Sequence, residues 1–255
     1  MKNTRNAVTK IASIVLTLAM MLSLFCIVGT ASASAATAPS HARFSLYCAS
    51  PYFSKYGAAS YEVYIQTRDD ARSQKVYVHY NYMSGQAWRD AEAELYTTLN
   101  DGSKIWKANF TSYNTEYCIK YVANGVTYWD NNNGRNYTSG TSIGSNAAIV
   151  SQKLGYQYGG WNGFQISALL HNYAYHKNVF VRYTTDNWNS YRDQALGYTS
   201  TNDDGNEIWT TYLGISDAEC HSENFHYAIC YQVNGKEYWA NNFGQDYDRS
   251  YYIYH

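Results

Sequence analysis

The sequence predicts an all-β protein made of two tandem immunoglobulin-like antiparallel β-sandwich domains. Many short segments alternate apolar and polar residues and are separated by turn-forming dipeptides, a pattern typical of antiparallel sandwiches. After the N-terminal apolar run, no long segment of the sequence has a helical period. The chain also repeats itself at a spacing of about 100 residues, which indicates two domains rather than a solenoid of shorter units.

The repeat consists of three blocks that occur in the same order in both halves of the chain. The first two blocks recur after 103 residues (179 − 76 and 209 − 106) and the third after 110 (239 − 129). An insertion of seven residues (110 − 103) in the second copy explains the difference. The paired blocks are Val76–Tyr80 with Val179–Tyr183, Ile105–Trp106 with Ile208–Trp209, and Tyr121–Asn132 with Tyr231–Asn242.

Strands and hairpins follow from the local pattern. Tyr61–Ile65, Val76–Tyr80 and Tyr117–Val122 have a period of two, as expected for strands that bury one face. Asn-Gly pairs favour type I′ hairpin turns, because both central residues need a positive φ. An Ile-Trp pair inside a strand is typical of a core, so we interpret Trp106 and Trp209 as core residues. The turn dipeptides are Asp101-Gly102, Asn124-Gly125, Asp204-Gly205 and Asn234-Gly235.

The N-terminal residues 1–35 are predicted to be a secretory signal peptide. Three cations precede the apolar run Ile11–Val28, and Ala33-Ser34-Ala35 fits a cleavage site. The alternative is an uncleaved membrane anchor, since the apolar run is nearly long enough to span a bilayer. We expect a secreted, extracellular protein that has no membrane span after cleavage and could stay associated with the cell surface. The form of the signal indicates a bacterial producer.

The remaining chain divides into a first module at residues 36–138, a linker at 139–146 and a second module at 147–255. The linker is small and polar, and its composition predicts flexibility. Secretion permits one disulfide per module. Cys48 with Cys118 and Cys220 with Cys230 are the available pairs, and the local pair Cys220–Cys230 is the better candidate.

Composition narrows the class of partner. Charged residues make up 15% of the chain and aromatic residues 17%, with 29 tyrosines and a formal net charge of −1. No basic patch is available for phosphates, so nucleic acid is not expected as a partner. Aromatic rings with polar tips, together with many amides and hydroxyls, suit a neutral polyhydroxylated ligand. No cofactor is expected.

The third repeated block carries the groups that such a ligand needs. An indole or phenol ring can stack on a sugar face, and asparagines can satisfy its hydroxyls. Strand alternation places the tyrosine and the tryptophan of each block on opposite faces, so one is core and the other exposed. The alternative is a plain hairpin whose asparagines cap turns. The block reads Tyr128-Trp129-Asp130-Asn131-Asn132 in the first copy and Tyr238-Trp239-Ala240-Asn241-Asn242 in the second.

Four segments of the second copy form a recognisable set: His171–Val179, Val181–Trp188, Tyr227–Tyr231 and Tyr238–Asn242. In their order and spacing they resemble carbohydrate-binding module family 21, which binds starch and glycogen. The family occurs on amylolytic enzymes and on glycogen-targeting phosphatase subunits. The resemblance therefore implies α-glucan ligands such as starch, glycogen and malto-oligosaccharides, with amylolytic enzymes as further partners.

The resemblance also implies particular contact residues. In the second copy these are Trp188 in the turn that begins at Asp186, Trp239 with Asn241 and Asn242, and a second site at Tyr175 and Tyr198. In the first copy they are Trp129, Asn131 and Asn132. One stacking tyrosine of the family is missing from both copies: Ala228 stands at its position in the second copy and Cys118 in the first. The first copy departs from the family at two more positions. Arg72 replaces the second-site tyrosine there, and Gly85 stands where the turn tryptophan is expected. Trp88, three residues on, is a candidate substitute.

The internal repeat argues against catalysis. A glycosidase needs two carboxylates at a defined separation, and most acidic residues of one copy are not acidic in the other. Asp90 with Asp193 and Asp101 with Asp204 are the pairs that persist. Two pairs of histidines, His171 with His176 and His221 with His226, are each five residues apart. This spacing does not place both side chains on one face of a strand, so no metal site is expected. We predict a non-catalytic α-glucan-binding protein that gains avidity from two modules. The alternative is a cell-surface or scaffold protein whose sandwiches bind another protein.

Overall fold

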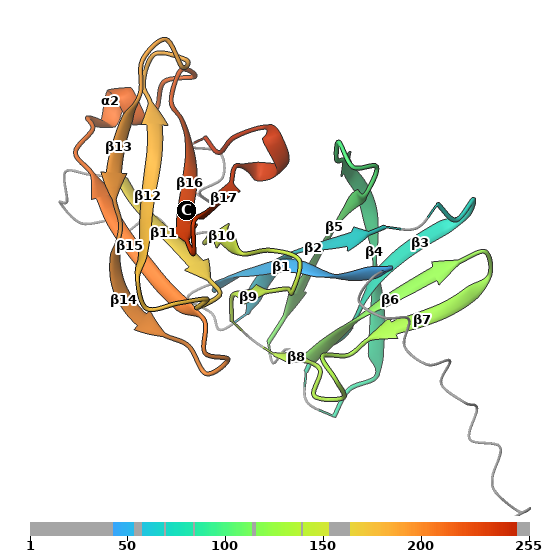
Figure 1. The fold of residues 1–255 in the computed structure, drawn as a ribbon. Helices are drawn as coiled ribbons and strands as arrows, with labels where there is room; N and C mark the ends of the chain where they lie inside the picture. The colour runs from blue at the N-terminus through green and yellow to red at the C-terminus, as the bar shows by residue number, and fades with distance from the viewer. Residues whose placement is uncertain are drawn as a thin grey trace, which may run out of the picture. The chain divides into compact units, whose positions relative to one another are not determined.

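The computed structural model describes residues 43–53, 58–68, 70–83, 85–113, 116–138, 140–152 and 164–248. The predicted signal peptide at 1–35 lies outside the described residues, as does the first linker position, 139. Among the described residues, no helix has the length and apolar character needed to cross a bilayer. All the strand pairs are antiparallel, so the predicted all-β class is confirmed (Figure 1).

The first module is a curled sheet with the strand order β7-β6-β3-β4-β5-β2-β1-β9, and β8 pairs with β6. The long strand β4 pairs with β3 through its first half and with β5 through its second half. One strand thereby belongs to both layers of the module. The bounds are β1 Phe44–Phe53, β2 Ala59–Thr67, β3 Gln74–Asn81, β4 Trp88–Thr98, β5 Lys104–Ser112, β6 Glu116–Ala123, β7 Val126–Asp130, β8 Tyr137–Thr138 and β9 Ser142–Ile143.

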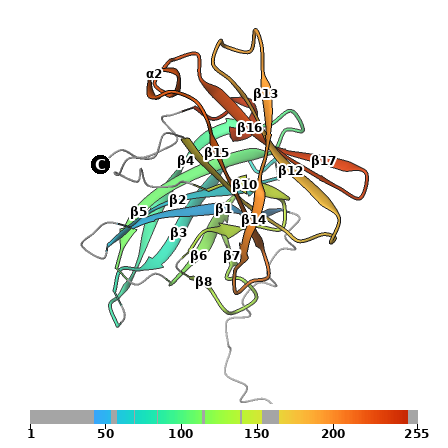
Figure 2. The same cartoon turned by 90° about the vertical axis from the view of Figure 1, so that its left-hand side faces the viewer.

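The second module has two four-stranded sheets, ordered β10-β11-β15-β14 and β13-β12-β16-β17 (Figure 2). Its short helix α2 lies between β15 and β16, where the seven-residue insertion was expected. The bounds are β10 Ile149–Ser151, β11 Phe164–Leu170, β12 Lys177–Thr184, β13 Arg192–Ala195, β14 Gly197–Thr201, β15 Glu207–Leu213, α2 Asp217–Cys220, β16 His226–Val233, β17 Lys236–Ala240 and the 3₁₀ turn η1 Asn242–Gly244.

The two modules have the same topology, so the sequence repeat is also a structural repeat. The orders β7-β6-β3-β4 and β4-β5-β2-β1 of the first module match β17-β16-β12-β13 and β14-β15-β11-β10 of the second. The strand β4 corresponds to β13 and β14, which are separated at the buried Leu196. Even a register shift recurs: Leu95 faces Trp106 and Tyr198 faces Trp209 just before the irregularity.

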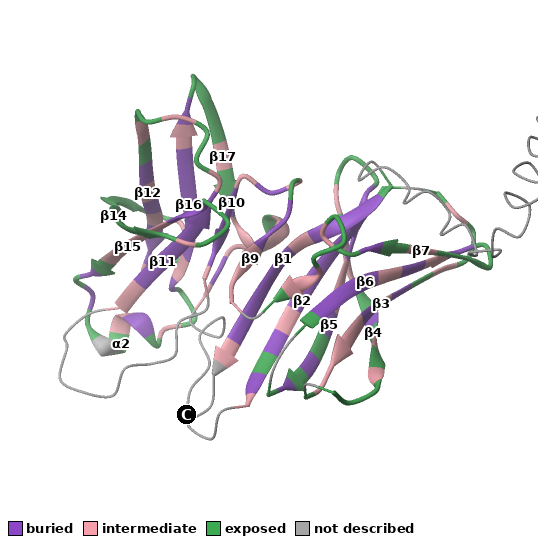
Figure 3. Ribbon diagram, turned by 90° about the horizontal axis from the view of Figure 1, so that it is seen from below, coloured by how far each residue is buried: buried purple, intermediate pink, exposed green. Residues whose placement is uncertain are grey.

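Alternating burial builds a core in each module (Figure 3). Along β12, Val179, Val181 and Tyr183 are buried, while Phe180 and Arg182 face outward. Several tyrosines are core residues, which is one reason for the high tyrosine content. The fully buried tyrosines are Tyr61, Tyr117, Tyr121, Tyr227 and Tyr231.

The two Ile-Trp blocks lie at the core, as predicted. Trp106 and Trp209 are partly buried and pack against the first and second core, respectively. Each indole N–H also has a partner: Trp106 donates to Thr67 Oγ1 at 2.9 Å and Trp209 to Glu207 Oε2 at 2.8 Å. Buried indoles need such partners, so these two rings have a structural role.

The hairpin predictions are confirmed at both Asn-Gly pairs. Asn124 and Gly125 have φ of 50° and 83°, and Asn234 and Gly235 have φ of 51° and 72°. Positive φ at both central positions is what a type I′ turn requires. The β6–β7 and β16–β17 hairpins therefore hold the third repeated block in the same register in both modules.

The linker is packed rather than flexible, which corrects the prediction from its composition. Ser142 and Ile143 pair with β1, and Ile143 and Ala147 are buried. A side chain at Gly144 would overlap the carbonyl oxygen of Leu46, so only glycine fits this close approach. A third hydrophobic cluster joins the linker to both modules; it contains Cys48, Tyr64, Ile105, Ile143, Ala147, Val150 and Leu169. Burial of Ile143, and of Ala147 at the start of the second module, outweighs the flexibility that the small residues of the linker would allow.

The Cys220–Cys230 disulfide considered from the sequence is absent. Cys220 packs in the core of the second module, among the inward residues of β16. Cys230 alternates with those residues and therefore points to the opposite face of the same strand. Two side chains on opposite faces of a sheet cannot form a bridge, and no disulfide joins the four cysteines among the described residues.

Candidate functional site: two equivalent aromatic faces

The outer face of the sheet β13-β12-β16-β17 gathers aromatic and polar side chains. We call this surface the second-module face and define it by Phe180, Arg182, Tyr191, Asp193 and Trp239. Because Tyr238 packs against the core, its neighbour Trp239 points outward, and 37% of Trp239 is exposed. The sequence predicted that one ring of each Tyr-Trp pair is core and the other exposed; in this pair the tryptophan is the exposed ring.

Arg182 is at the centre of this face. Its Nε and Nη2 atoms donate to the two carboxylate oxygens of Asp193, each at 2.7 Å. Its guanidinium carbon lies 4.3 Å from the ring centroid of Tyr191 and 5.5 Å from that of Trp239. The hydrogen bonds to Asp193 raise the pKa of Arg182, so the guanidinium stays charged. The bidentate pair and the two cation–π contacts fix the positions of both rings.

A shallow groove of about 470 Å³ runs across the second-module face beside Trp239. Phe180 meets the indole edge-on, with ring centroids 5.8 Å apart and an interplanar angle of 88°. A chain of amides and a carboxylate borders the groove: Asn178 donates to Gln232 at 3.0 Å, and Gln232 donates to Glu237 at 2.7 Å. The groove thus presents a ring surface next to hydrogen-bonding groups, which is what a sugar requires.

The first module has an equivalent surface, which we call the first-module face. It consists of His79, Trp88, Asp90, Lys120 and Trp129. The His79 ring stacks on Trp88 with centroids 5.1 Å apart and an angle of 20°, and it meets Trp129 edge-on at 5.2 Å. Trp129 is 38% exposed. The structure therefore brings the two candidate tryptophans of the first module together.

Strand register shows that the two faces correspond residue by residue. His79 is paired with Asp90 across β3 and β4, just as Arg182 is paired with Asp193 across β12 and β13. The same offset of 103 (191 − 88) makes Tyr191 the counterpart of Trp88. Both modules therefore share one arrangement. A nitrogen-containing side chain, guanidinium or imidazole, lies between two aromatic rings and contacts an aspartate.

Asp90 anchors the first-module face. It accepts hydrogen bonds at 2.6 Å from Lys120 Nζ and lies 2.6 Å from His79 Nδ1. Partial burial raises the pKa of Asp90, but the hydrogen bonds from Lys120 and His79 outweigh this and leave the pKa below its ordinary value. Lys120 also lies over the Trp129 ring, 5.9 Å from its centroid.

The turn at Asp186 has a different arrangement. The Asp186 carboxylate accepts from Ser190 Oγ at 2.7 Å, from Ser190 N at 2.9 Å and from Thr184 Oγ1 at 2.7 Å. Its oxygens thus hold the turn that gives Trp188 a φ of 64°. Trp188 is half-buried, hydrogen-bonds to Asp246 and does not line the groove on the second-module face.

The Asp186 carboxyl should titrate far below an ordinary aspartate. Hydrogen bonds from Ser190 lower its pKa from 3.8 to about 2. Since the pKa is lowered on folding, the contact stabilises the turn above the ordinary pKa, and this stabilisation is lost as the pH falls through about 2. An NMR titration of side-chain carboxyl shifts measures this value. The Ser190→Ala variant should move the pKa toward 3.8; a wild-type midpoint already there would contradict the hydrogen-bonded turn.

The candidate asparagines cap turns in both modules. Asn131 and Asn241 each accept from a glycine N–H three residues later at 3.0 Å. Asn132 and Asn242 each donate to the carbonyl four residues later, at 3.1 and 3.2 Å. The hairpin alternative considered from the sequence therefore describes these contacts. Asn242 Oδ1 also accepts from the Tyr96 hydroxyl at 3.1 Å, so Asn131, Asn132 and Asn241 are the residues that keep an amide atom for a ligand.

The predicted second site remains a prediction. Tyr175 is 91% exposed and Tyr198 is 56% exposed, on the loop before β12 and on β14, respectively. Tyr198 hydrogen-bonds to Thr201 at 3.0 Å and meets Trp209 edge-on at 6.1 Å. No contact between the two tyrosines is found among the described residues, although both rings are accessible.

Sequence reasoning missed the centre of each face. Arg182, Tyr191 and His79 were not among the candidates, because the strand pairing that brings them to the tryptophans joins distant residues. One signal was available: Asp90 and Asp193 are kept in both copies at an offset of 103 (193 − 90). Each of these aspartates now proves to anchor the central side chain of its face.

The segment that carries the second-module face is similar to known proteins. Residues 166–250 match the family model described as "Carbohydrate/starch-binding module (family 21)". Glycogen-binding subunit 76A of Drosophila melanogaster is 30% identical over 81 residues, and protein phosphatase 1 regulatory subunit 3B of Bos taurus is 35% identical over 80 residues. These alignments cover 32% and 31% of this chain but only 12% and 28% of the two relatives.

Among solved structures, the chain is similar to the starch-binding domain of Rhizopus oryzae glucoamylase, solved with β-cyclodextrin and maltoheptaose. That likeness has 28% identity and a TM-score of 0.33, and it covers 41% of this chain and 99% of the domain. The family match covers the second module, and a second family-21 module at 36–138 stays a prediction. On the family match alone, residues 166–250 are similar to a carbohydrate/starch-binding module of family 21.

Proposed function

We propose that the protein is a secreted, non-catalytic α-glucan-binding protein whose principal contact is Trp239 on the second-module face. The observation that carries the proposal is the exposed indole of Trp239 beside a groove, inside the segment that matches a starch-binding family. A relative named as a glycogen-binding subunit supports the same ligand class.

The mechanism is reversible adsorption without bond making or breaking. The apolar face of a glucose ring stacks on Trp239, and the Phe180 edge holds the indole in place. The Glu237 carboxylate and the amide groups along the groove accept and donate hydrogen bonds to sugar hydroxyls. Arg182 positions the indole from below through its pair with Asp193. Stacking and hydrogen bonding then replace the water that covered the ring and the polar groups.

The first-module face contributes a second contact to the same polymer. Trp129 and Trp88 flank His79 there, in the register that Trp239 and Tyr191 have around Arg182. A polymer long enough to reach both faces converts the second binding event into an intramolecular one, and avidity can then exceed that of one site by about 10²–10⁴. In this function the protein would hold starch or its fragments near amylolytic enzymes.

Retention on polysaccharides tests the proposal. The full chain should be retained by amylose gels and by granular starch and should pass through cellulose, because the proposed ligand is an α-glucan. Affinity electrophoresis with both polymers measures the difference. Equal retention on both polymers would overturn the ligand class, while capture of a secreted protein without any polysaccharide binding would favour the scaffold alternative.

A reducing-sugar assay tests the non-catalytic part of the proposal. Prolonged incubation with soluble starch should release no reducing ends above a heat-treated control. Sustained release that scales with protein concentration would show that the chain is an enzyme.

A further inference from the structure

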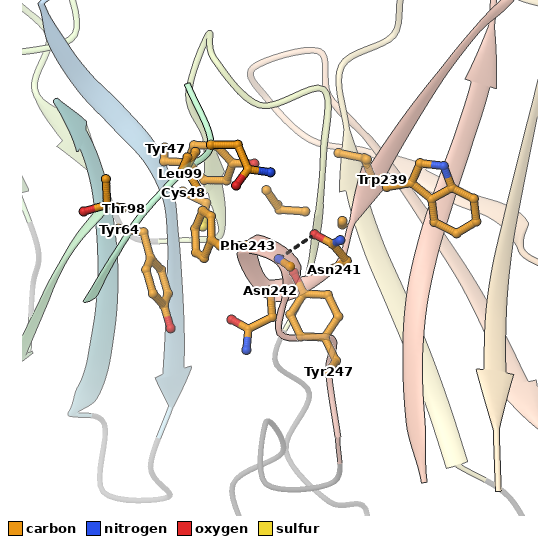
Figure 4. Close-up of a pocket in the computed structure, with 15 residues that line it drawn as sticks. Tyr47, Cys48, Tyr64, Thr98, Leu99, Trp239, Asn241, Asn242, Phe243 and Tyr247 are labelled. Carbon is orange, nitrogen blue, oxygen red and sulfur yellow. Dashed lines mark hydrogen bonds between the residues drawn. The ribbon is translucent and has the colours of Figure 1, made fainter. Parts of the chain in front are cut away.

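A second cavity lies where the linker, both modules and the loop after β17 meet. Its volume is about 340 Å³, near the lower end of the roughly 300–1,000 Å³ range of ligand pockets. We call it the inter-module pocket. Figure 4 shows Tyr64 and Thr98 of the first module on one side, Asn241 and Tyr247 of the second on the other, and Phe243 between them.

Aromatic contacts hold the walls of the inter-module pocket in place. Phe243 packs against Tyr47 with ring centroids 4.9 Å apart and against Tyr64 at 5.4 Å. Tyr96 donates to Asn242 Oδ1 at 3.1 Å and so ties the β17 loop to the first module. The pocket is therefore built jointly by two modules, and neither module alone would form it.

The chemistry of the lining points to a neutral ligand. None of the residues that line the inter-module pocket is an Asp, Glu, Lys, Arg or His. The phenols stay protonated, since burial raises the pKa of Tyr47 to about 12 and that of Tyr64 further above its ordinary value. A charged ligand would find no counter-ion in this pocket and would lose its hydration.

Several polar groups in the lining are available for a ligand. No described residue hydrogen-bonds to the side chains of Thr98 and Asn100 or to the Tyr47 hydroxyl. Asn241 uses its Oδ1 on Gly244 N, as the dashed line in Figure 4 shows, and its Nδ2 has no partner among the described residues. Hydroxyl and amide groups beside aromatic rings can satisfy the hydroxyls and the apolar face of a sugar.

We propose that the inter-module pocket binds a short neutral oligosaccharide, namely the terminal glucose units of an α-glucan chain. This inference rests on the proposed α-glucan function and adds a site that requires both modules. Trp239 lies in the wall of both the groove and the pocket, and its ring points away from the other labelled residues of the pocket (Figure 4). A chain that stacks on Trp239 can therefore continue over β17 and end in the pocket.

The test uses the full chain, isotopically labelled, and maltotriose as the probe. At saturation, maltotriose should shift the backbone amide resonances of Thr98, Asn100 and Gly244 together with those of the second-module face. The double variant Thr98→Ala/Asn100→Ala should abolish the shifts in the pocket and weaken maltotriose binding about tenfold, because two ligand hydrogen bonds are lost. Its retention on granular starch through the two faces should persist.

The chain offers a matched control. Asp203 is the counterpart of Asn100 at the offset of 103 (203 − 100), in the equivalent hairpin, and it does not line the pocket. The single variant Asn100→Ala should weaken maltotriose binding, whereas Asp203→Ala should bind maltotriose like the wild type. If the protein is retained on starch but maltotriose shifts only the amide resonances of the second-module face, the inter-module pocket is not a binding site. The proposed α-glucan function would still hold. Absence of both starch retention and maltotriose shifts would overturn both.

Discussion

Trp239→Ala is expected to remove most of the affinity of the protein for soluble α-glucan. The indole is the exposed ring beside the groove of the second-module face, and it also borders the inter-module pocket. Loss of a central aromatic contact of this kind costs about 2 kcal/mol, which is roughly a 30-fold increase in Kd. Isothermal titration with maltoheptaose measures the change.

Two comparison variants make this result specific. Tyr212→Ala removes an aromatic ring that is 54% exposed on β15, away from both faces, and should leave the Kd unchanged. Trp188→Ala should have an intermediate effect, because its ring is half-buried and tied to Asp246. A loss at Trp188 that exceeds the loss at Trp239, in variants with wild-type circular dichroism, would place the main contact at the Asp186 turn.

Glu207→Ala should cause the largest loss of folding stability among single polar substitutions in the second module. Lys177 Nζ lies 2.8 Å from Glu207 Oε2, and the two side chains are only 3% and 11% exposed. Glu207 also accepts the Trp209 indole N–H at 2.8 Å. Removal of the carboxylate leaves a buried ammonium without its counter-ion, which costs about 3–5 kcal/mol. Chemical denaturation with two spectroscopic probes measures the free energy of unfolding.

The double variant Lys177→Met/Glu207→Leu separates the charge effect from loss of packing. It replaces both charges by apolar side chains of similar size, and such replacements of buried pairs are often neutral or stabilising. We expect it to be more stable than Glu207→Ala. Equal destabilisation of the single and double variants would mean that shape, rather than the unpaired ammonium, determines the loss. The first module has Lys104 and Gln74 at these positions, joined at 3.3 Å, so it does not depend on a carboxylate there.

The sequence predicted the fold well because its signals are local. Alternation along Val179–Tyr183 fixes which residues enter the core, and Asn234-Gly235 fixes the turn that sets the register of Trp239. The same parity argument placed one ring of each Tyr-Trp pair outside. Each of these conclusions needs only neighbouring residues.

The centre of each face and the packed linker could not be predicted in this way. Arg182 meets Tyr191 and Asp193 through the pairing of β12 with β13, and it meets Trp239 across two strands. The linker looks flexible from its small polar residues, yet Ile143 is held by contacts with residues far along the chain. Pairing and packing over such distances leave no periodic signal in either segment.

The packed linker determines how the two faces can cooperate. A flexible tether would let the faces search for any pair of sites within reach, with a gain that varies smoothly with tether length. Ile143, Ala147 and the contact between Phe243 and Tyr47 instead hold the modules as one unit. Binding at both faces then costs no conformational entropy of a flexible linker. It succeeds, however, only on glucan chains whose spacing and curvature match the exposed rings of the two faces. The protein would therefore discriminate between polymers by their geometry, even where every glucose unit is chemically the same.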